Sequence, residues 1–172
     1  MLIRKADLCD IKPVADTYDE LLDHELITVS YTNWKKGMYP TIETAEMTQR
    51  NGTLYVLEDN GEICASVILN HVQPCEHFKI NWKYDASDDE TMVVHTLCVP
   101  PSKAGRGYGS AMMEYIKNLA IKTGCKIIRL DTYIGNLPAQ SMYKKLGYEC
   151  AGTANVFFEG IQKDLMYFEY KL

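Results

Sequence analysis

The amino-acid sequence predicts an α/β protein whose β-sheet contains both antiparallel and parallel strands. An Asn60-Gly61 turn joins two apolar runs, which is a strong signal for an antiparallel hairpin. A strand, a glycine-rich turn, a helix and a second strand follow one another over residues 92–133, which is the order of a parallel βαβ unit. Two apolar runs, 150–156 and 164–170, then close the chain as a second antiparallel pair.

The composition indicates an ordinary globular protein. A chain of 172 residues suits a single domain over residues 1–172 and can bury a sizeable core. The net charge of -5 disfavours general nucleic-acid binding through a basic surface. No apolar run approaches ~20 residues, so no membrane span is expected, and the first ten residues lack the apolar core of a signal peptide. The 6 cysteines include no CxxC pair, so we expect reduced thiols in a cytoplasmic protein without a metal site.

The remaining elements follow from periodicity and capping residues. Before residue 70 we expect strands at 2–5, 53–58 and 62–69, a helix capped by Asp7 or Asp10 that runs to about Leu26, and a helix at 42–50 capped by Thr41. After residue 107 we expect helices at 108–123 and from Pro138, ended by Gly124 and Gly147, and a strand at 126–133.

The glycine-rich turn of the βαβ unit predicts an anion site. Gly105, Gly107 and Gly109 alternate with other residues, which lets the backbone turn tightly and approach a ligand closely. Because a helix begins directly afterwards, its free N–H groups and positive dipole end favour phosphate or pyrophosphate. The P-loop pattern needs a Lys-Ser or Lys-Thr pair, and the dinucleotide fingerprint needs a glycine at Ser110 or Met112, so neither pattern fits.

Two short motifs together resemble the GNAT family of N-acetyltransferases. The turn at residues 104–109 is similar to that family's acetyl-CoA pyrophosphate loop, Arg/Gln-x-x-Gly-x-Gly/Ala. Gly107 and Gly109 match the signature, whereas Ala104 departs from the long polar side chain that is usual at its first position. Residues 136–148 match Asn-x-x-Ala-x-x-x-Tyr-x-x-x-Gly-Tyr, which looks like the second signature. The two motifs lie one strand apart, in the order that the family has.

The resemblance implies a fold and a cofactor site. In the family a mixed sheet, flanked by helices, opens where the fourth and fifth strands splay apart, and the pantetheine arm of acetyl-CoA lies in that gap. Carried over to this sequence, the cofactor-binding residues are Leu97, Cys98, Val99, Ala104, Gly105, Arg106, Gly107, Tyr108, Gly109, Ser110, Asn136, Ala139 and Tyr143. Backbone groups of Leu97 and Val99 would hold the pantetheine amides, and those of residues 106–110 would hold the pyrophosphate. Asn136 would contact the pantetheine side, and Tyr143 would reach the sulfur.

The implied reaction is direct attack of a primary amine, from a small molecule or a peptide, on acetyl-CoA in a ternary complex. A backbone N–H near Leu97 or Cys98 can stabilise the developing oxyanion, and Tyr143 can protonate the leaving thiolate as a general acid. His95 stands where the family often has a glutamate, and it is our first candidate base. Asp131 is the second, as base or for amine recognition. Strand alternation places Cys98 opposite His95, which disfavours an acetyl-cysteine route.

Several alternatives stay open. The segment 28–40 holds large side chains that either line the amine pocket or pack on the core, namely Tyr31, Trp34, Met38 and Tyr39. The segment 71–90 carries an acidic run that we interpret as a solvated loop, with an amine-selecting lid as the alternative. His71 and His77 have no matching ligand cluster, so we do not expect them to bind metal. A non-catalytic acyl-CoA-binding module is the competing function. In the family the closing strands often pair between chains, which would allow a homodimer.

Overall fold

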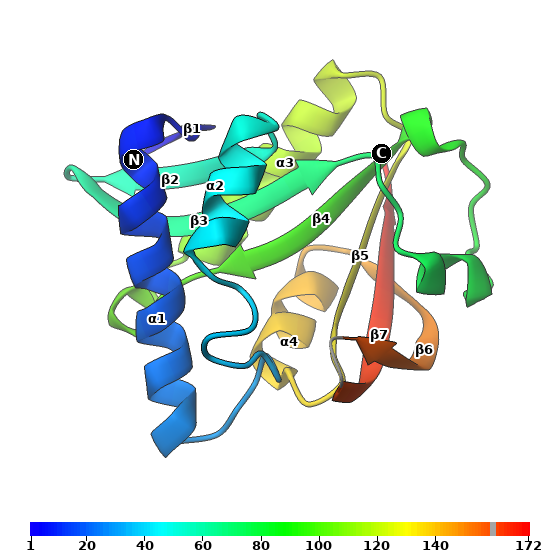
Figure 1. Cartoon of the computed structure of the whole chain (residues 1–172). Helices are drawn as coiled ribbons and strands as arrows, with labels where there is room; N and C mark the ends of the chain where they lie inside the picture. The colour runs from blue at the N-terminus through cyan, green and yellow to red at the C-terminus, as the bar shows by residue number, and fades with distance from the viewer. Residues whose placement is uncertain (159–160) are drawn as a thin grey trace. The chain divides into compact units, whose positions relative to one another are not determined.

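The computed structural model describes residues 1–158 and 161–172, and its chain divides into two compact units (Figure 1). The first unit comprises Met1–Ser30, Trp34–Leu69 and His95–Tyr115. The second unit comprises Tyr31–Asn33, Asn70–Val94 and Ile116–Leu172. The expectation of one domain over the whole chain stays a prediction.

An antiparallel sheet forms the frame of the first unit. Strands β1 (Leu2–Lys5), β2 (Leu54–Asp59) and β3 (Glu62–Asn70) pair in that order, and the second half of β4 (Thr91–Cys98) comes next. The turn between β2 and β3 has φ values of 54° at Asn60 and 80° at Gly61, as a two-residue hairpin turn of this twist requires. The predicted hairpin is therefore confirmed.

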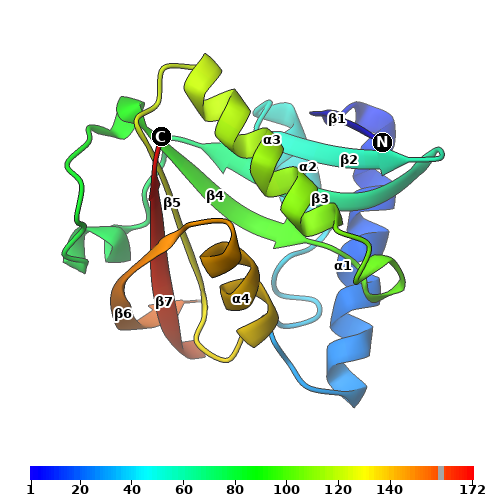
Figure 2. The same ribbon diagram turned by 180° about the vertical axis from the view of Figure 1, so that it is seen from behind.

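Two helices cover one face of this sheet (Figure 1). Helix α1 (Ile11–Ile27) follows the short 3-10 turn η1 (Leu8–Asp10), and α2 (Ile42–Arg50) begins directly after its N-cap Thr41. Their apolar faces meet the strands in one core, which contains Val14, Tyr18, Ala45, Leu54, Val56, Ile68 and Cys98. The first turns of α3 (Tyr108–Lys122) lie on the opposite face (Figure 2).

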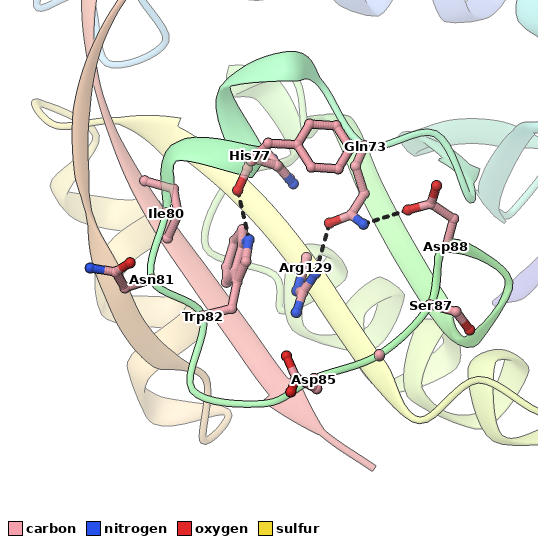
Figure 3. A pocket seen from close by; sticks show the side chains of 11 residues that line it. Gln73, His77, Ile80, Asn81, Trp82, Asp85, Ser87, Asp88 and Arg129 are labelled. Carbon is pink, nitrogen blue, oxygen red and sulfur yellow. Dashed lines mark hydrogen bonds between the residues drawn. The ribbon is translucent and has the colours of Figure 1, made fainter.

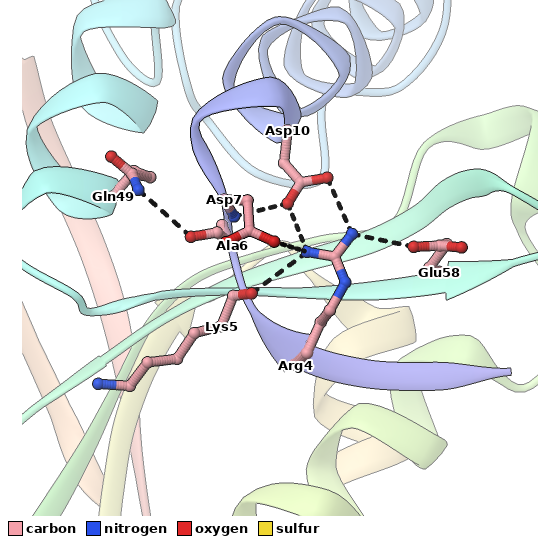
Figure 4. A network of polar contacts seen from close by, with 7 residues as sticks. All are labelled: Arg4, Lys5, Ala6, Asp7, Asp10, Gln49 and Glu58. Carbon is pink, nitrogen blue, oxygen red and sulfur yellow. Dashed lines mark hydrogen bonds and ion pairs between the residues drawn. The ribbon is translucent and has the colours of Figure 1, made fainter.

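A cluster of charged side chains joins β1 to the beginning of α1 (Figure 4). The Arg4 guanidinium donates to both carboxylate oxygens of Asp10, at 2.5 Å and 3.1 Å, and to Glu58 Oε2 at 2.9 Å. The backbone N–H of Asp7 also donates to Asp10 Oδ2, at 2.7 Å. The almost buried carboxylate of Asp10 is thereby paired and hydrogen-bonded, as burial of a charge requires.

A mixed sheet forms the frame of the second unit. The first half of β4 runs parallel to β5 (Ile127–Tyr133), with Thr91–Val94 opposite Ile127–Leu130. Strand β7 (Ile161–Lys171) is antiparallel to β5 and to β6 (Glu149–Phe158), so the strand order is β4-β5-β7-β6. The parallel pair confirms the predicted βαβ unit, and the α/β class with mixed strand directions is confirmed. The splay of β4 from β5 stays a prediction.

The two faces of the β5–β7 pair have different covers. Helix α4 (Leu137–Lys145) packs on one face, where the Tyr143 and Phe168 rings lie 5.5 Å apart between centroids. The segment 71–90 contains the 3-10 turns η2 (Cys75–Lys79) and η3 (Asp88–Glu90). It contacts side chains on the other face of the strands, such as Arg129 and Tyr167. Residues on the two faces therefore meet different environments.

Candidate functional site

The glycine-rich turn of the first unit has the conformation that an anion site needs. Gly105 and Gly107 have φ values of 74° and 81°, in the left-handed region that favours glycine. Helix α3 begins at Tyr108. The Ala111 N–H donates to the carbonyl oxygen of Gly107, the residue before the helix, at 2.9 Å. The N–H groups that precede Ala111 in the first turn have no helical acceptor, so they are free to bind an anion.

Neighbouring elements hold this turn in place. The Tyr108 hydroxyl donates to Asp59 Oδ2 at 2.8 Å, which ties the beginning of α3 to the end of β2. The 3-10 turn η4 (Pro101–Lys103) precedes the glycines, and there Ser102 donates from its N–H and Oγ to the Glu20 carboxylate, at 2.7 Å and 3.1 Å. Lys103 pairs with Glu62. Since contacts with α1, β2 and β3 fix the turn, it is preorganised for binding.

Strand β4 departs from regular geometry two residues before it ends. Thr96 has a φ of 49°, which is strained for a β-branched residue, and its side-chain oxygen is hydrogen-bonded to the Tyr39 hydroxyl. His95 and Leu97 on either side are half-buried, whereas Cys98 is fully buried. Such backbone strain persists only where the surrounding structure imposes it, and strained residues are common at functional sites. The irregularity immediately precedes Leu97, Cys98 and Val99, the residues that were predicted to contact the acetyl-CoA amides and oxyanion.

The buried Cys98 thiol does not suit nucleophilic catalysis. Its Sγ lies 3.7 Å from the carbonyl oxygen of Thr17 on α1, inside the core of the first unit. Burial raises the pKa of Cys98 to about 12, so the thiol stays protonated at neutral pH. These observations argue against Cys98 as a nucleophile.

The segment 28–40 was predicted either to line a pocket or to pack on the core. Trp34 packs against the core of the first unit, and its ring meets Tyr39 edge-on with centroids 6.0 Å apart. Met38 is 49% exposed. For Trp34 and Tyr39 the structure therefore favours packing, and the pocket interpretation stays a prediction for Tyr31 and Met38.

In the second unit, α4 positions the predicted general acid. Asn136 is its N-cap, with Oδ1 accepting from the Ala139 N–H at 3.2 Å, and Gly147 follows its end with a φ of 87°. Tyr143 is buried against Tyr148 and Phe168, at 5.9 Å and 5.5 Å between ring centroids. Burial, and then the Asp131 carboxylate, raises the pKa of Tyr143, which keeps its proton at neutral pH. The tyrosine is therefore in the state that a proton donor needs.

Asp131 has a partner that the sequence analysis did not predict. Its Oδ2 lies 3.2 Å from Nε2 of His77, whose side chain is 0% exposed, whereas the Asp131 side chain is 26% exposed. The two residues are 54 positions apart, and His77 stands in a stretch without periodicity. The only signal for its burial in the sequence was the nearby Trp82, whose Nε1 donates to the His77 carbonyl oxygen at 2.8 Å.

Most side chains of the segment 71–90 are exposed or half-buried, as expected for a solvated loop, whereas His77 is buried. Asp85, Asp88 and Asp89 are exposed. Beneath them Arg129 on β5 donates to Gln73 Oε1 at 2.9 Å and to the Tyr84 carbonyl oxygen at 2.7 Å. The buried Glu169 accepts from the Lys83 N–H at 2.7 Å. Because buried charged groups need hydrogen-bond partners, these contacts hold the segment against the strands.

A pocket of about 550 Å³ opens between this segment and β5 (Figure 3). The Arg129 guanidinium lies 4.4 Å from the centre of the Trp82 ring, and burial lowers the pKa of Arg129. Gln73 links Arg129 to the rim by donating to Asp88 Oδ1 at 2.7 Å. Because Gln73 joins Arg129 to Asp88, these residues anchor the segment to β5. The lid alternative stays a prediction.

The predicted site residues thus fall into two groups. The first unit brings together His95, Leu97 and the glycine turn, and the second brings together Asp131, Asn136 and Tyr143. Over residues 1–158 and 161–172, no three His, Cys, Asp or Glu side chains gather as metal ligands. The helices in the same ranges include none that is both long and apolar enough to cross a membrane.

Known structures share this fold. A GNAT-family acetyltransferase from Streptococcus agalactiae superposes with a TM-score of 0.81 at 20% identity, covering 99% of this chain and 95% of that one. A Salmonella typhimurium protein solved with its cofactor acetyl-CoA gives a TM-score of 0.70 at 16% identity, covering 99% and 92%. At such identities the likeness shows the fold alone, which is that of the acetyltransferases.

Sequence comparison identifies the family itself. The pattern of the acetyltransferase (GNAT) family matches residues 18–148, and the chain belongs to this family. An uncharacterized N-acetyltransferase of Methanocaldococcus jannaschii is 29% identical over 140 residues. That match covers 77% of this chain and 58% of the relative. The chain therefore spans little more than half the length of this relative.

Proposed function

We propose that the protein is an acetyl-CoA-dependent N-acetyltransferase that transfers the acetyl group to a primary amine by direct attack in a ternary complex. One observation carries the proposal. The family's pyrophosphate motif forms a preorganised left-handed glycine turn at the beginning of α3, with free N–H groups in its first turn. The acetyl-CoA bound by the Salmonella typhimurium protein of the same fold supports the choice of cofactor.

Binding of the cofactor would use backbone groups more than side chains. The N–H groups of residues 106–110 would hold the pyrophosphate, which explains how the site tolerates Ala104 at the first motif position. Backbone groups of Leu97 and Val99, next to the strained Thr96, would hold the pantetheine amides. Asn136 uses its side-chain oxygen as a helix cap, and its side-chain amide N–H groups would contact the cofactor.

In the chemical step, the amine nitrogen attacks the thioester carbonyl carbon, the C–N bond forms and the C–S bond breaks. A backbone N–H near Leu97 or Cys98 would stabilise the charge that develops on the carbonyl oxygen. The amine proton passes to His95, to Asp131 or to water, and the leaving thiolate takes its proton from Tyr143. The raised pKa of the buried Tyr143 supports its role as the proton donor.

Further properties follow from the same proposal. The acceptor is a primary amine of a small molecule or a peptide, and the free state of all six cysteines supports a reducing, cytoplasmic location. Strand β6 ends the strand order of the second unit, which supports pairing with a second copy. Sedimentation velocity measures that assembly directly.

The decisive test is a calorimetric titration with acetyl-CoA and with free CoA, followed by an amine panel in which CoA release is measured. We expect saturable one-to-one binding by the wild type and much weaker binding by Gly107→Ala. Gly61→Ala is the matched control, because Gly61 has nearly the same φ, 80° against 81°, and equally open surroundings, but lies in the hairpin turn. Absence of binding to either ligand, or equal losses in the two variants, would contradict the proposal. Binding without turnover on any amine would favour the non-catalytic module.

A further inference from the structure

A contact between a buried histidine and a partly exposed carboxylate stands out in the second unit. His77 comes from η2 and Asp131 from β5, and the imidazole Nε2 lies 3.2 Å from the carboxylate Oδ2. Asp131 was a candidate for proton abstraction or amine recognition, whereas no role was predicted for His77. We infer that His77 is a positioning residue, which holds Asp131 so that its second carboxylate oxygen faces the acceptor amine. The inference rests on the proposed function.

The surroundings of His77 decide which ring nitrogen carries the proton. The side chain is 0% exposed, and its Nδ1 is buried without a hydrogen-bond partner among the described residues. A proton on Nδ1 would leave an unsatisfied buried N–H, whereas a proton on Nε2 is donated to Asp131. The Nε2–H tautomer therefore fits the site, and His77 acts as a hydrogen-bond donor to Asp131.

Aromatic rings fix the orientation of the imidazole. Its centroid lies 5.2 Å from that of Trp82 and 5.4 Å from that of Tyr167, the latter in an edge-on arrangement. Trp82 Nε1 also donates to the His77 carbonyl oxygen at 2.8 Å. Because the ring is packed on two sides and its backbone is tethered, His77 offers its donor in one direction.

The hydrogen bond to His77 engages one carboxylate oxygen of Asp131 and leaves the other oxygen available to a ligand. The engaged oxygen is Oδ2, and the Asp131 side chain is 26% exposed. The partly exposed second carboxylate oxygen can accept hydrogen bonds from the ammonium form of an amine and orient its nitrogen. The acceptor class that this arrangement selects is a cationic primary amine.

The β5–β7 pair separates this amine-binding side from the general acid. Asp131 is opposite Tyr167 in the register, and Tyr143 packs on Phe168, the next residue of β7. Since side chains alternate along a strand, Asp131 and Tyr143 lie on opposite faces of this pair of strands. A nucleophile would then approach from one face while the thiolate is protonated from the other, which suits direct attack.

The segment 71–90 gains a function from this geometry. It supplies His77 and Trp82, and the Arg129 and Glu169 contacts hold it against the strands. The segment thus belongs to the acceptor side of the site as a rigid support. Its length and sequence, with the acidic run on its outer side, would be tied to the choice of amine.

Two substitutions of His77 separate the hydrogen bond from the packing. His77→Phe keeps an aromatic ring against Trp82 and Tyr167 but has no donor, whereas His77→Gln can donate from its amide nitrogen. We expect kcat/KM for the amine to fall by about 10- to 100-fold in His77→Phe, as expected for loss of a hydrogen bond to a carboxylate. His77→Gln should stay within a factor of about three of the wild type. The KM for acetyl-CoA should be unchanged in both variants.

A double-substitution cycle shows whether His77 acts through Asp131. In an Asp131→Ala background, His77→Phe should cause no further loss, because the acceptor of its hydrogen bond is already removed. A His77→Phe variant that keeps the wild-type kcat/KM would overturn the inference, and so would additive losses in the double variant. If His77→Phe does not fold, failure of His77→Gln to retain activity while its melting temperature is unchanged would overturn it equally.

A measurement on the protein without ligands distinguishes this inference from the proposed function. Nitrogen-15 NMR of the His77 ring should show the Nε2–H tautomer, with an Nε2–H signal that is altered in Asp131→Ala. The Nδ1–H tautomer in an active enzyme would overturn the inference alone. Absence of acetylation for every amine tested would overturn the proposed function, and the role of His77 in turnover with it.

Discussion

The Tyr39 hydroxyl is hydrogen-bonded to the side-chain oxygen of Thr96, at the residue where β4 takes a left-handed backbone conformation. A β-branched residue with a φ of 49° is strained, and the contact gives this strained residue a fixed partner. His95 and Leu97 flank Thr96, so the geometry of the candidate base and of the candidate cofactor-binding backbone depends on this position. The contact therefore links the irregular segment before α2 to the proposed chemistry.

Removal of the Tyr39 hydroxyl should weaken the first unit. We expect Tyr39→Phe to lower the free energy of unfolding by about 1 kcal/mol, the usual net value of one hydrogen bond, as measured by urea denaturation. Tyr115→Phe is the matched control, since the Tyr115 hydroxyl makes no hydrogen bond among the described residues. Equal effects of the two substitutions would show that the Thr96 contact adds nothing.

Removal of the Tyr143 hydroxyl should affect the chemical step alone. We expect Tyr143→Phe to lower kcat by about 100-fold, which is typical of a lost general acid, with acetyl-CoA affinity unchanged in calorimetry. Because burial and Asp131 raise the pKa of Tyr143, the loss should be constant between about pH 6 and pH 9, below the range in which a tyrosine ionises. Tyr148→Phe, at the adjacent ring, should change kcat little. Unchanged turnover in Tyr143→Phe would remove the residue from the mechanism.

His95 should determine the pH dependence if it is the base. We expect His95→Ala to lower kcat/KM for the amine mainly at acidic and neutral pH, where a histidine outcompetes water as a proton acceptor. The measurement is a kcat/KM profile from about pH 5.5 to pH 9, compared with that of the wild type. A profile of unaltered shape would assign proton removal to Asp131 or to water.

The ion pair between Arg4 and Asp10 should make stability depend on pH. Burial acts to raise the pKa of Asp10, but the hydrogen bonds from Arg4 and from the Asp7 N–H outweigh it, and the pKa is lowered. A lowered pKa contributes stability that is present above the pKa of the unfolded state and is lost as pH falls through the folded value. Asp10→Asn should therefore lower the free energy of unfolding by about 1–3 kcal/mol at neutral pH. The difference should shrink below about pH 4.

Asp16→Asn provides the control for that prediction. Asp16 also pairs with a lysine, Lys12, but its side chain is 56% exposed, so its loss should cost about 0.5 kcal/mol or less. Urea denaturation of both variants at several pH values gives the comparison. An Asp10→Asn effect that is as small as that of Asp16→Asn, or that is the same at every pH, would contradict the argument.

The Cys98 thiol should be unreactive in the folded protein. Because it is buried and its pKa is raised to about 12, we expect no alkylation of Cys98 by iodoacetamide in the folded protein at neutral pH. The exposed Cys9, Cys75 and Cys150 should react and serve as internal controls. Mass spectrometry after incubation with acetyl-CoA alone should find no acetyl group on Cys98, and a stable acetyl-Cys98 would restore the two-step route.

Local rules of the sequence determined the elements and the motifs. Thr41 begins α2 at the predicted residue, Asn60-Gly61 forms the hairpin turn, and Gly107 precedes a helix that starts at Tyr108. Each of these features depends on residues within a few positions of one another, through capping, turn conformation and periodicity. For that reason the α/β class and the candidate anion turn could be predicted without a structure.

Only the tertiary structure decided which distant side chains meet. His77 and Asp131 are 54 residues apart, Tyr39 and Thr96 are 57 apart, and neither pair follows a period or a motif. These contacts form because buried polar groups need hydrogen-bond partners in the folded state. The partners are neighbours in space, so the order of residues along the chain does not predict them. The sequence by itself therefore determined the residue types that carry the proposed chemistry, and the packing decided how His77 orients Asp131.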